Sequence, residues 1–334
     1  MTPTRVVIAG YGHIAHNHAQ AVLHAEDTIL CGVLGRDAAK CDAFAERYSA
    51  PKRYTSVDAL AQDVDVDAVI IAWPNALHAP VAEAMMRAGK HVLVEKPMAM
   101  NEAEARRMQE VARDTGRQLM VGHMWRFDRE AQALREVIAS GALGDIVKTK
   151  GYGVHTHWGP EGWFTQPELA GGGALIDMGV HAIDTVRYLL GDPDPVTVYA
   201  RLGTRFGEYD VDDDGILVIE WSQGTVSLIE SGWWHPHTDG VEAATQLFGT
   251  LGYGRLFPTS WSHGPEDNLI VTTPPFPARK EHCDQHIYDG QVVAFAERIR
   301  DGAQVVPGPE HGRVVMAICD AAYRSSELGQ VVAL

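Results

Sequence analysis

Short apolar runs alternate along the first third of the chain with longer stretches in which apolar residues recur every three or four positions. The runs have the length of buried strands, and the longer stretches have the period of an amphipathic helix. Strands that alternate with helices in this way predict a parallel sheet with helices on both faces. The expected strands are Val6–Ala9, Ile29–Leu34, Ala68–Ala72, His91–Val94 and Gln118–Val121.

The pattern changes near residue 125, where strands joined by turns begin to dominate and predict a mainly antiparallel sheet. The expected helices are Arg129–Ser140, Ala174–Leu190, Ile287–Asp301 and Glu310–Leu328. The expected strands are Ile146–His157, Gly215–Trp221, Thr225–Trp233, Leu247–Leu256 and Asn268–Thr273. A chain of 334 residues is long enough for two domains, each with its own core. We therefore predict an α/β protein, with a doubly wound parallel sheet in residues 1–124 and an α+β domain in residues 125–334.

The composition narrows the class of protein. The chain carries 44 acidic and 28 basic residues, a net charge of −16, which disfavours nucleic acids and anionic membranes as partners. Four cysteines without C-x-x-C spacing indicate reduced thiols and a cytoplasmic protein. No apolar stretch approaches the roughly 18 residues of a membrane span. A strand-like run begins at Arg5, so no signal peptide is expected.

The first predicted strand runs into a glycine-rich turn, Gly10-Tyr11-Gly12-His13-Ile14-Ala15, which opens the next helix. In such a G-x-G-x-x-A turn the first glycine allows the tight bend, and the second lets the backbone approach a pyrophosphate at the helix N-terminus. The turn therefore predicts a dinucleotide site at Gly10, Gly12, His13 and Ile14.

The end of the second strand bears on which dinucleotide binds. NAD enzymes usually carry an acidic residue there, on the ribose 2′-hydroxyl, but this chain has Gly35-Arg36. A small residue followed by arginine leaves room for a 2′-phosphate and supplies a cation, so NADP is expected ahead of NAD. The alternative is a solvated Arg36, with Asp37 binding the hydroxyl of NAD.

Two further motifs contain the candidate catalytic residues. The strand ending at Val94 runs into Glu95-Lys96-Pro97, at the sheet edge where ligands of parallel sheets bind; a partly desolvated lysine there can transfer a proton. After a glycine cluster at 171–173, Asp177 and His181 stand four residues apart and share one helix face. Asp184 falls on the same side and is expected to orient the imidazole of His181.

These motifs, together with His18 behind the glycine-rich turn, Pro74-Asn75 followed by His78, and Arg126-Phe127-Asp128, occur in the order typical of one family. The chain resembles the Gfo/Idh/MocA oxidoreductases, the group that contains glucose–fructose oxidoreductase and inositol dehydrogenase. The resemblance runs along the whole chain. It implies an N-terminal Rossmann domain and a C-terminal domain whose open, mainly antiparallel sheet forms the interface of a homodimer or homotetramer.

The resemblance also implies an activity, the NAD(P)-dependent transfer of a hydride between the nicotinamide and a secondary alcohol or ketone carbon of a sugar, cyclitol or related polyol. It implies a cis Lys96–Pro97 bond. The catalytic residues, expected to meet at one cavity, would be Lys96, Asp177 and His181. The cofactor contacts would include Gly35, Arg36, Trp73, Pro74, Asn75, His78, Glu95 and Lys96. The substrate contacts would be Trp125, Arg126, His155, His157, Asp177 and His181.

Several alternatives stay open at this point. The same family contains redox-assisted, NAD-dependent glycosidases, reductases of C=N or C=C bonds, and non-catalytic dinucleotide-sensing regulators. Metal binding has candidates among the 16 histidines, namely His155 with His157, His235 with His237, and His282 with His286. Alternating histidines on a strand point to opposite faces, and the third pair has no evident third ligand, so no metal is predicted. Trp158, Trp163 and Phe164 are candidates for a wall that stacks on a sugar or, equally, for core.

Overall fold

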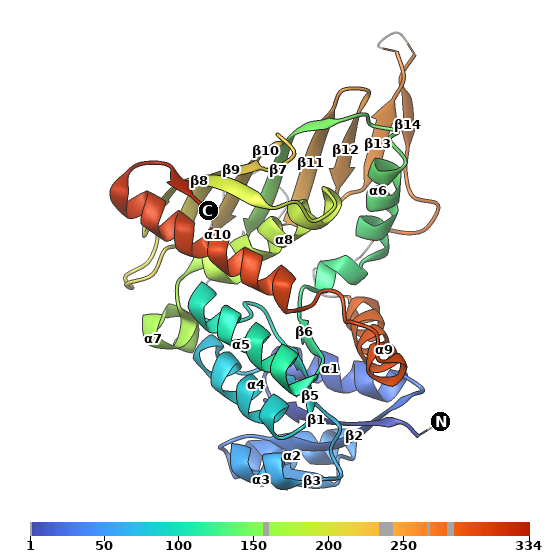
Figure 1. Cartoon of the computed structure of the whole chain (residues 1–334), viewed down its shortest axis with the longest axis vertical. Helices are drawn as coiled ribbons and strands as arrows, with labels where there is room; N and C mark the ends of the chain where they lie inside the picture. The colour runs from blue at the N-terminus through green and yellow to red at the C-terminus, as the bar shows by residue number, and fades with distance from the viewer. Residues whose placement is uncertain (1, 156–159, 234–242, 266–267, 279–283) are drawn as a thin grey trace. The chain divides into compact units, whose positions relative to one another are not determined.

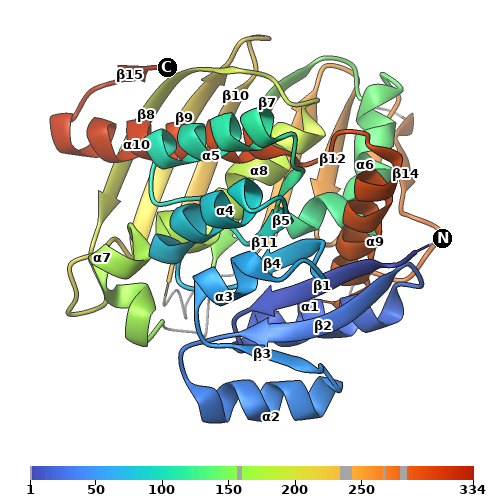
Figure 2. The ribbon, with the colours of Figure 1, turned by 60° about the horizontal axis from the view of Figure 1, so that its bottom comes forward.

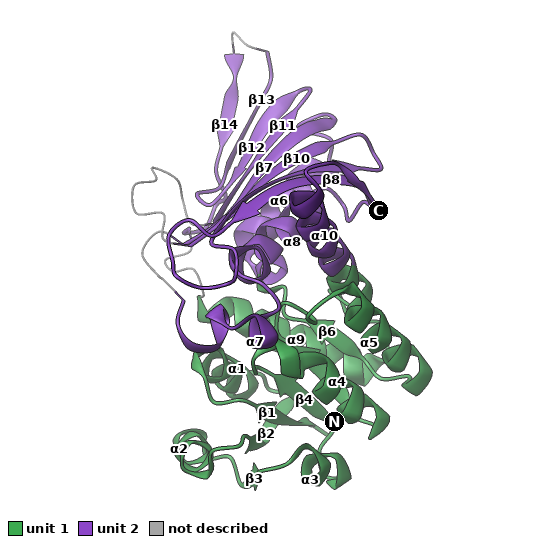
Figure 3. Cartoon of the chain, turned by 90° about the vertical axis from the view of Figure 1, so that its left-hand side faces the viewer, with its two compact units in different colours: residues 1–124, 283–313 green, residues 125–282, 314–334 purple. Residues whose placement is uncertain are grey.

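The computed structural model describes residues 2–155, 160–233, 243–265, 268–278 and 284–334. The chain divides into two compact units, residues 1–124 with 283–313 and residues 125–282 with 314–334 (Figure 3). The sequence-based division assigned 283–313 to the second domain. The structure groups them with the first unit, because helix α9 (Gln285–Asp301) packs against helix α1 (His13–His24).

Unit 1 contains, within its described residues, a six-stranded parallel sheet in the order β3-β2-β1-β4-β5-β6 (Figure 2). This is the strand order of a doubly wound dinucleotide-binding sheet, as predicted. The strands are β1 (Thr4–Ala9), β2 (Thr28–Leu34), β3 (Lys52–Tyr54), β4 (Ala68–Ile71), β5 (His91–Val94) and β6 (Leu119–Val121). All five predicted strands are present. Strand β3 was not predicted, because three residues are too few to show a period.

The helices of unit 1 cover both faces of this sheet. Helix α1 packs with α9 on one face, and α4 packs with α5 on the other (Figure 3). The remaining bounds are α2 (Ala38–Tyr48), α3 (Val57–Gln62), η1 (Asn75–Leu77), α4 (His78–Arg87) and α5 (Glu102–Thr115). Because both faces are covered, the central strands are apolar and buried along their length, which is why they appeared in the sequence as uninterrupted apolar runs.

Unit 2 is built on a mixed sheet of nine strands, counted over the described residues, in the order β14-β13-β12-β11-β7-β10-β9-β8-β15 (Figure 1). Only the pair β7–β10 is parallel among these neighbours, so the sheet is mainly antiparallel, as predicted. The strands are β7 (Ile146–Val154), β8 (Pro195–Gly203), β9 (Asp214–Trp221), β10 (Val226–Gly232), β11 (Ala243–Gly249), β12 (Gly252–Leu256), β13 (Ser260–His263), β14 (Ile270–Thr272) and β15 (Val332–Ala333). The single strand predicted over Leu247–Leu256 is in fact β11 and β12, joined by a tight turn.

Helices α6 and α8 lie on one face of this second sheet (Figure 3). On the other face alternate residues such as Ile216 and Val218 stay exposed, so the sheet is open. The helical bounds are η2 (Met124–Phe127), α6 (Arg129–Ala139), η3 (Gly162–Thr165), α7 (Pro167–Ala170), η4 (Leu175–Gly179), α8 (Val180–Leu189) and α10 (Pro309–Leu328). Segment η4 is a π-helix, so the helix predicted from Ala174 begins with a wider turn. Within the described part of the chain, no helix combines the length and apolar composition that crossing a membrane requires.

Candidate active site

The glycine-rich turn of unit 1 fits a dinucleotide pyrophosphate. Gly10 has φ +130°, and a Cβ placed there would overlap the carbonyl oxygen of Ala72, so only glycine is tolerated. A Cβ at Gly12 would meet nothing within 4 Å, and no side chain caps the N-terminus of α1 that follows. His13 is exposed and Ile14 half-buried. Because Gly12 and His13 are exposed, an anion can reach this end of α1, and the helix dipole favours one.

Gly35 stands directly after β2, where NAD enzymes carry the acid that binds the ribose 2′-hydroxyl. A Cβ there would overlap the ring of Tyr11 and lie 2.7 Å from Sγ of Cys41, so an acidic side chain does not fit. Arg36 beside it is exposed. Asp37, the alternative acid, caps helix α2 by accepting a hydrogen bond from the backbone N–H of Lys40 at 3.1 Å.

Lys40 is a second cation at this place that the sequence reasoning missed. Its Nζ lies 5.8 Å from the ring centroid of Tyr11 and 3.9 Å from Oδ2 of Asp37. The signal available in the sequence was a basic residue in the first turn of the helix that follows the second strand.

His78, an expected cofactor contact, is almost fully buried and joins two loops. Its Nδ1 lies 2.7 Å from the carbonyl oxygen of Pro97, and its Nε2 lies 2.8 Å from that of Trp73. Burial lowers the pKa of the imidazole. Because both ring nitrogens face backbone carbonyls, His78 fastens the loop after β4 to the loop after β5 instead of offering a nitrogen to a ligand.

Trp73, Pro74 and Asn75, which precede His78 in the sequence, differ from it in burial. The indole of Trp73 is half-buried, and its Cδ1 lies 3.5 Å from the position of a Cβ at Gly10, so the ring borders the glycine-rich turn. Pro74 is half-buried, and Asn75 is buried at the start of η1. Of these residues, Trp73 is the one that the structure places beside the glycine-rich turn.

Glu95 and Lys96 follow directly on β5. Glu95 is buried, and its Oε1 lies 2.7 Å from Nε2 of His18, a fully buried residue of α1. Its Oε2 accepts a hydrogen bond from the backbone N–H of Lys96 at 3.1 Å. Glu95 thus supports the turn that carries Lys96. The Lys96–Pro97 bond is cis, as the resemblance predicted, and the Lys96 side chain is half-buried.

The segment that carries Asp177 and His181 is anchored at its start by Asp212. Its carboxylate accepts hydrogen bonds from the backbone N–H groups of Gly173 and Leu175, both at 2.8 Å, and from the hydroxyl of Tyr323 at 2.6 Å. A Cβ at Gly173 would overlap the carbonyl oxygen of Asp212. The glycine cluster therefore makes room for a buried acid that caps the helix from a distant part of the chain.

Asp177 lies in the π-helix η4, and His181 lies in the first turn of α8. Oδ2 of Asp177 accepts a hydrogen bond from Nε1 of Trp233 at 3.0 Å. The ring of His181 is nearly buried and stacks at 4.7 Å, with a 34° tilt, on the ring of Trp125. The two predicted catalytic groups of unit 2 are thus each held by a buried tryptophan.

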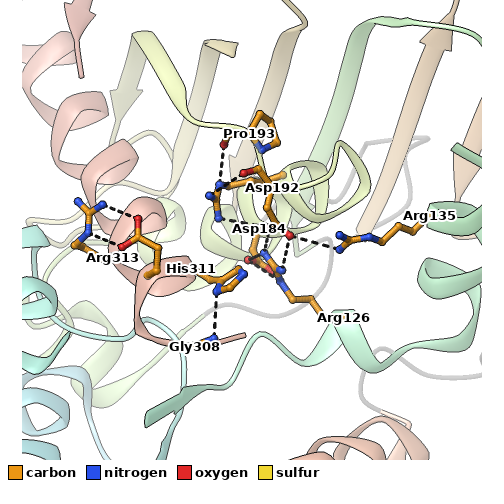
Figure 4. A network of polar contacts seen from close by, with 10 residues as sticks. Arg126, Arg135, Asp184, Asp192, Pro193, Gly308, His311 and Arg313 are labelled. Carbon is orange, nitrogen blue, oxygen red and sulfur yellow. Dashed lines mark hydrogen bonds and ion pairs between the residues drawn. The ribbon is translucent and has the colours of Figure 1, made fainter. Parts of the chain in front are cut away.

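Arg126, expected to contact the substrate, is instead bound by two carboxylates of its own unit (Figure 4). Its Nε and Nη2 lie 2.9 and 2.7 Å from oxygens of Asp184, and Nη2 also lies 2.7 Å from Oδ1 of Asp192. Burial alone would lower the pKa of Arg126, but the charges of the two carboxylates outweigh it and leave the pKa above its usual range. The carboxylate of Asp184, expected to orient His181, is therefore engaged with Arg126, and the pair anchors α8.

The remaining candidates are the histidines considered for substrate or metal binding and the aromatic residues considered for stacking on a sugar. His155 follows β7, is half-buried, and donates its backbone N–H to the carbonyl of Gly232 at 2.9 Å. Among the residues that the structure describes, no group of three or more His, Cys, Asp and Glu side chains is arranged to hold a metal ion. Trp163 and Phe164 stack on one another at 3.9 Å. Candidates that lie outside the described residues are His157, Trp158, His235, His237 and His282.

Two family models match the chain. That of the oxidoreductase family with an NAD-binding Rossmann fold matches residues 4–123, and that of the GFO/IDH/MocA C-terminal domain matches residues 131–254. The D-xylose 1-dehydrogenase (NADP(+)) 2 of Haloferax volcanii is 30% identical, over 98% of this chain and 98% of its own. The chain belongs to the GFO/IDH/MocA oxidoreductase family.

Other members of this family are similar over the same length. The D-glucoside 3-dehydrogenase of Escherichia coli (strain K12) is 29% identical, over 100% of this chain and 98% of its own. The structure of a levoglucosan dehydrogenase in complex with NADH and L-sorbose matches with a TM-score of 0.91 at 25% identity, covering 100% of this chain and 99% of that one. The chain is an NAD(P)-dependent oxidoreductase.

Proposed function

We propose that this oxidoreductase transfers a hydride between NADP(H) and a secondary alcohol or ketone carbon of a sugar or cyclitol. One observation within unit 1 carries the proposal. The open Gly12 turn follows β1, and Lys96 follows β5, so both stand at the same carboxyl edge of one parallel sheet, as a pyrophosphate site and a proton-transfer group would need to. The names of relatives that are similar along the whole chain, a D-xylose and a D-glucoside dehydrogenase, support the substrate class.

In this proposal the bound nicotinamide accepts or supplies the hydride. Lys96 and His181 hydrogen-bond the reacting oxygen, and one of them takes up or returns its proton. Asp177 accepts a hydrogen bond from the substrate and so fixes which carbon reacts. The buried supports of these residues favour such roles, because a group that must orient a substrate has to be rigid itself.

The preference for NADP rests on three neighbouring positions. Gly35 excludes an acid at the place where NAD enzymes carry one. Arg36 is exposed beside it, and Lys40 adds a second cation within the first turn of α2. Asp37 is engaged as a helix cap. Two cations beside a glycine fit a 2′-phosphate better than a 2′-hydroxyl.

The exposed face of the nine-stranded sheet supports the expectation of a homo-oligomer. Ile216, Val218 and Val226 on this face are 49%, 36% and 39% exposed. We propose that this face pairs with a second copy in a homodimer or homotetramer, because apolar side chains on an uncovered sheet favour association. Light scattering on the purified protein tests this, and an Ile216→Glu variant should shift the mass towards the monomer.

Three buried thiols support a reducing, cytoplasmic location. Cys31, Cys41 and Cys319 are free and buried, and burial raises the pKa of each. Protonated, buried thiols are poor nucleophiles and need no oxidising compartment.

A substrate panel tests the proposed reaction. Aldoses, inositols and other polyols are incubated with NADP⁺ and with NAD⁺, and the absorbance of the reduced nicotinamide is followed. We expect reduced nucleotide to accumulate with at least one sugar or cyclitol. Hydrolysis of a glycoside without net change in the cofactor would instead show a redox-assisted glycosidase, and tight cofactor binding without any turnover would show a sensor.

A further inference from the structure

Trp233, which directly follows β10, is held in one orientation by several buried contacts. Its side chain is 1% exposed. Its backbone N–H donates to the carbonyl of Asp213 at 2.8 Å, and the ring of Tyr209 meets its indole edge-on at 6.0 Å. The hydroxyl of Tyr209 in turn donates to Oδ2 of Asp213 at 3.0 Å. The direction of the indole N–H is therefore set by the surrounding fold.

That N–H points at Asp177. The distance from Nε1 of Trp233 to Oδ2 of Asp177 is 3.0 Å, across 56 residues of sequence, between the end of β10 and the π-helix η4. An indole is a donor only, so the contact requires Oδ2 to accept. A hydrogen bond to a carboxylate favours its ionised form and fixes the plane of the group.

We propose that Trp233 is a positioning residue for the carboxylate of Asp177. It keeps Asp177 ionised and holds it at one angle, so that Asp177 can accept a hydrogen bond from the substrate. The proposal rests on the function of Asp177 proposed above. Asp177 is half-buried, and the Trp233 that donates to it is buried.

The first test is kinetic and uses two matched tryptophans. Trp233→Phe removes the N–H and keeps an aromatic ring. Trp221→Phe is the control, because Trp221 is as deeply buried in the same unit and donates its Nε1–H to Ser227 at 2.6 Å, away from Asp177. We expect Trp233→Phe to lower kcat/KM for the sugar by about 10- to 100-fold, the loss expected for a hydrogen bond to a charged group. The dissociation constant of the cofactor should not change. Trp221→Phe should retain kcat/KM within about threefold.

The second readout is a pH profile. Without the indole donor, the ionised form of Asp177 loses a stabilising partner, so the acid limb of kcat/KM should move to higher pH in Trp233→Phe. A merely structural tryptophan would lower activity without moving this limb. An unmoved limb in Trp233→Phe would therefore overturn the proposal.

The third readout does not depend on activity or on folding of the Trp233 variant. In protein labelled with ¹⁵N-tryptophan, the indole N–H signal of Trp233 should shift as Asp177 titrates, and this shift should vanish in Asp177→Asn. The signal of Trp221 should be the same in both proteins. A Trp233 signal that is identical in the two proteins at every pH would refute the contact.

These outcomes separate the present inference from the proposed function. If Asp177→Asn keeps full turnover, the substrate role of Asp177 fails and the proposed function must be revised. If Asp177→Asn loses turnover while Trp233→Phe behaves as Trp221→Phe does, only the positioning role of Trp233 fails.

Discussion

Nε2 of His18 lies 2.7 Å from Oε1 of Glu95, so a histidine on the helix behind the glycine-rich turn supports the residue that precedes Lys96. Burial alone would raise the pKa of Glu95, but the hydrogen bond and charge of His18 and the charge of Lys96 leave it below its usual value. A carboxyl group whose pKa falls on folding stabilises the native state above its ordinary pKa. That contribution is lost as the pH falls through the folded value.

Glu95→Gln should therefore change how stability depends on pH. At pH 7 we expect a loss of about 1.5–3 kcal/mol in the free energy of unfolding, since charge-assisted hydrogen bonds are removed. Below about pH 4, the ordinary range of a glutamate, the wild type should lose stability more steeply than the variant. Urea unfolding at several pH values measures both. Glu110→Gln, an exposed change on α5, is the control, and coincident curves for the wild type and Glu95→Gln would contradict the account.

The two glycines of the turn should behave differently. Gly10→Ala should destabilise the fold, because the Cβ would overlap the carbonyl of Ala72 at a positive φ. Gly12→Ala should keep the melting temperature within a few degrees, because nothing lies within 4 Å of its Cβ, yet weaken cofactor binding by at least about tenfold. Thermal unfolding and calorimetric titration separate the effects. Unchanged cofactor affinity in Gly12→Ala would show that the pyrophosphate does not approach this backbone.

We expect Arg126 to stabilise the fold through its ion pairs. Arg126→Ala leaves Asp184 and Asp192 without their main partner, so we expect a loss of about 3–5 kcal/mol in the free energy of unfolding. Arg135→Ala is the matched control, because this half-exposed arginine lies 3.5 Å from Asp192 and should contribute about 1 kcal/mol or less. Chemical denaturation of both variants measures the difference. Similar small losses in the two would contradict a structural role for Arg126.

The strands and the glycine-rich turn were predictable because their signals are local. A buried strand is a short apolar run, and the turn stands at its end in a fixed spacing. The contacts of the side chains that hold the site were not predictable, since they depend on how loops and distant segments are brought together in the fold. His78 was expected to meet the cofactor, yet its partners are the carbonyls of Trp73 and Pro97. Trp233 and Asp212 carry no motif, and only the folded sheet brings them to the segment of Asp177.

Cofactor choice should follow the cations after β2. We expect NADP(H) to bind more tightly than NAD(H), and Arg36→Ala to narrow the gap by about 1.5–3 kcal/mol, the cost of a lost charge-assisted contact to phosphate. Lys40→Ala should further reduce the difference in binding free energy between NADP(H) and NAD(H). The affinity for NAD(H) should change little in either variant. Calorimetric titration with both nucleotides measures this. Tighter binding of NAD(H) to the unmutated protein would overturn the preference.

Hydride transfer between a sugar carbon and the nicotinamide can be followed with deuterium. The best substrate from the panel is prepared with deuterium on the reacting carbon and incubated with the oxidised cofactor, and the reduced nicotinamide is then examined by NMR and mass spectrometry. We expect one deuterium at C4 of the nicotinamide, formed by the wild type and about 10²–10⁴ times more slowly by Lys96→Ala or His181→Ala. Reduced cofactor without deuterium, or unchanged rates in both variants, would contradict this expectation.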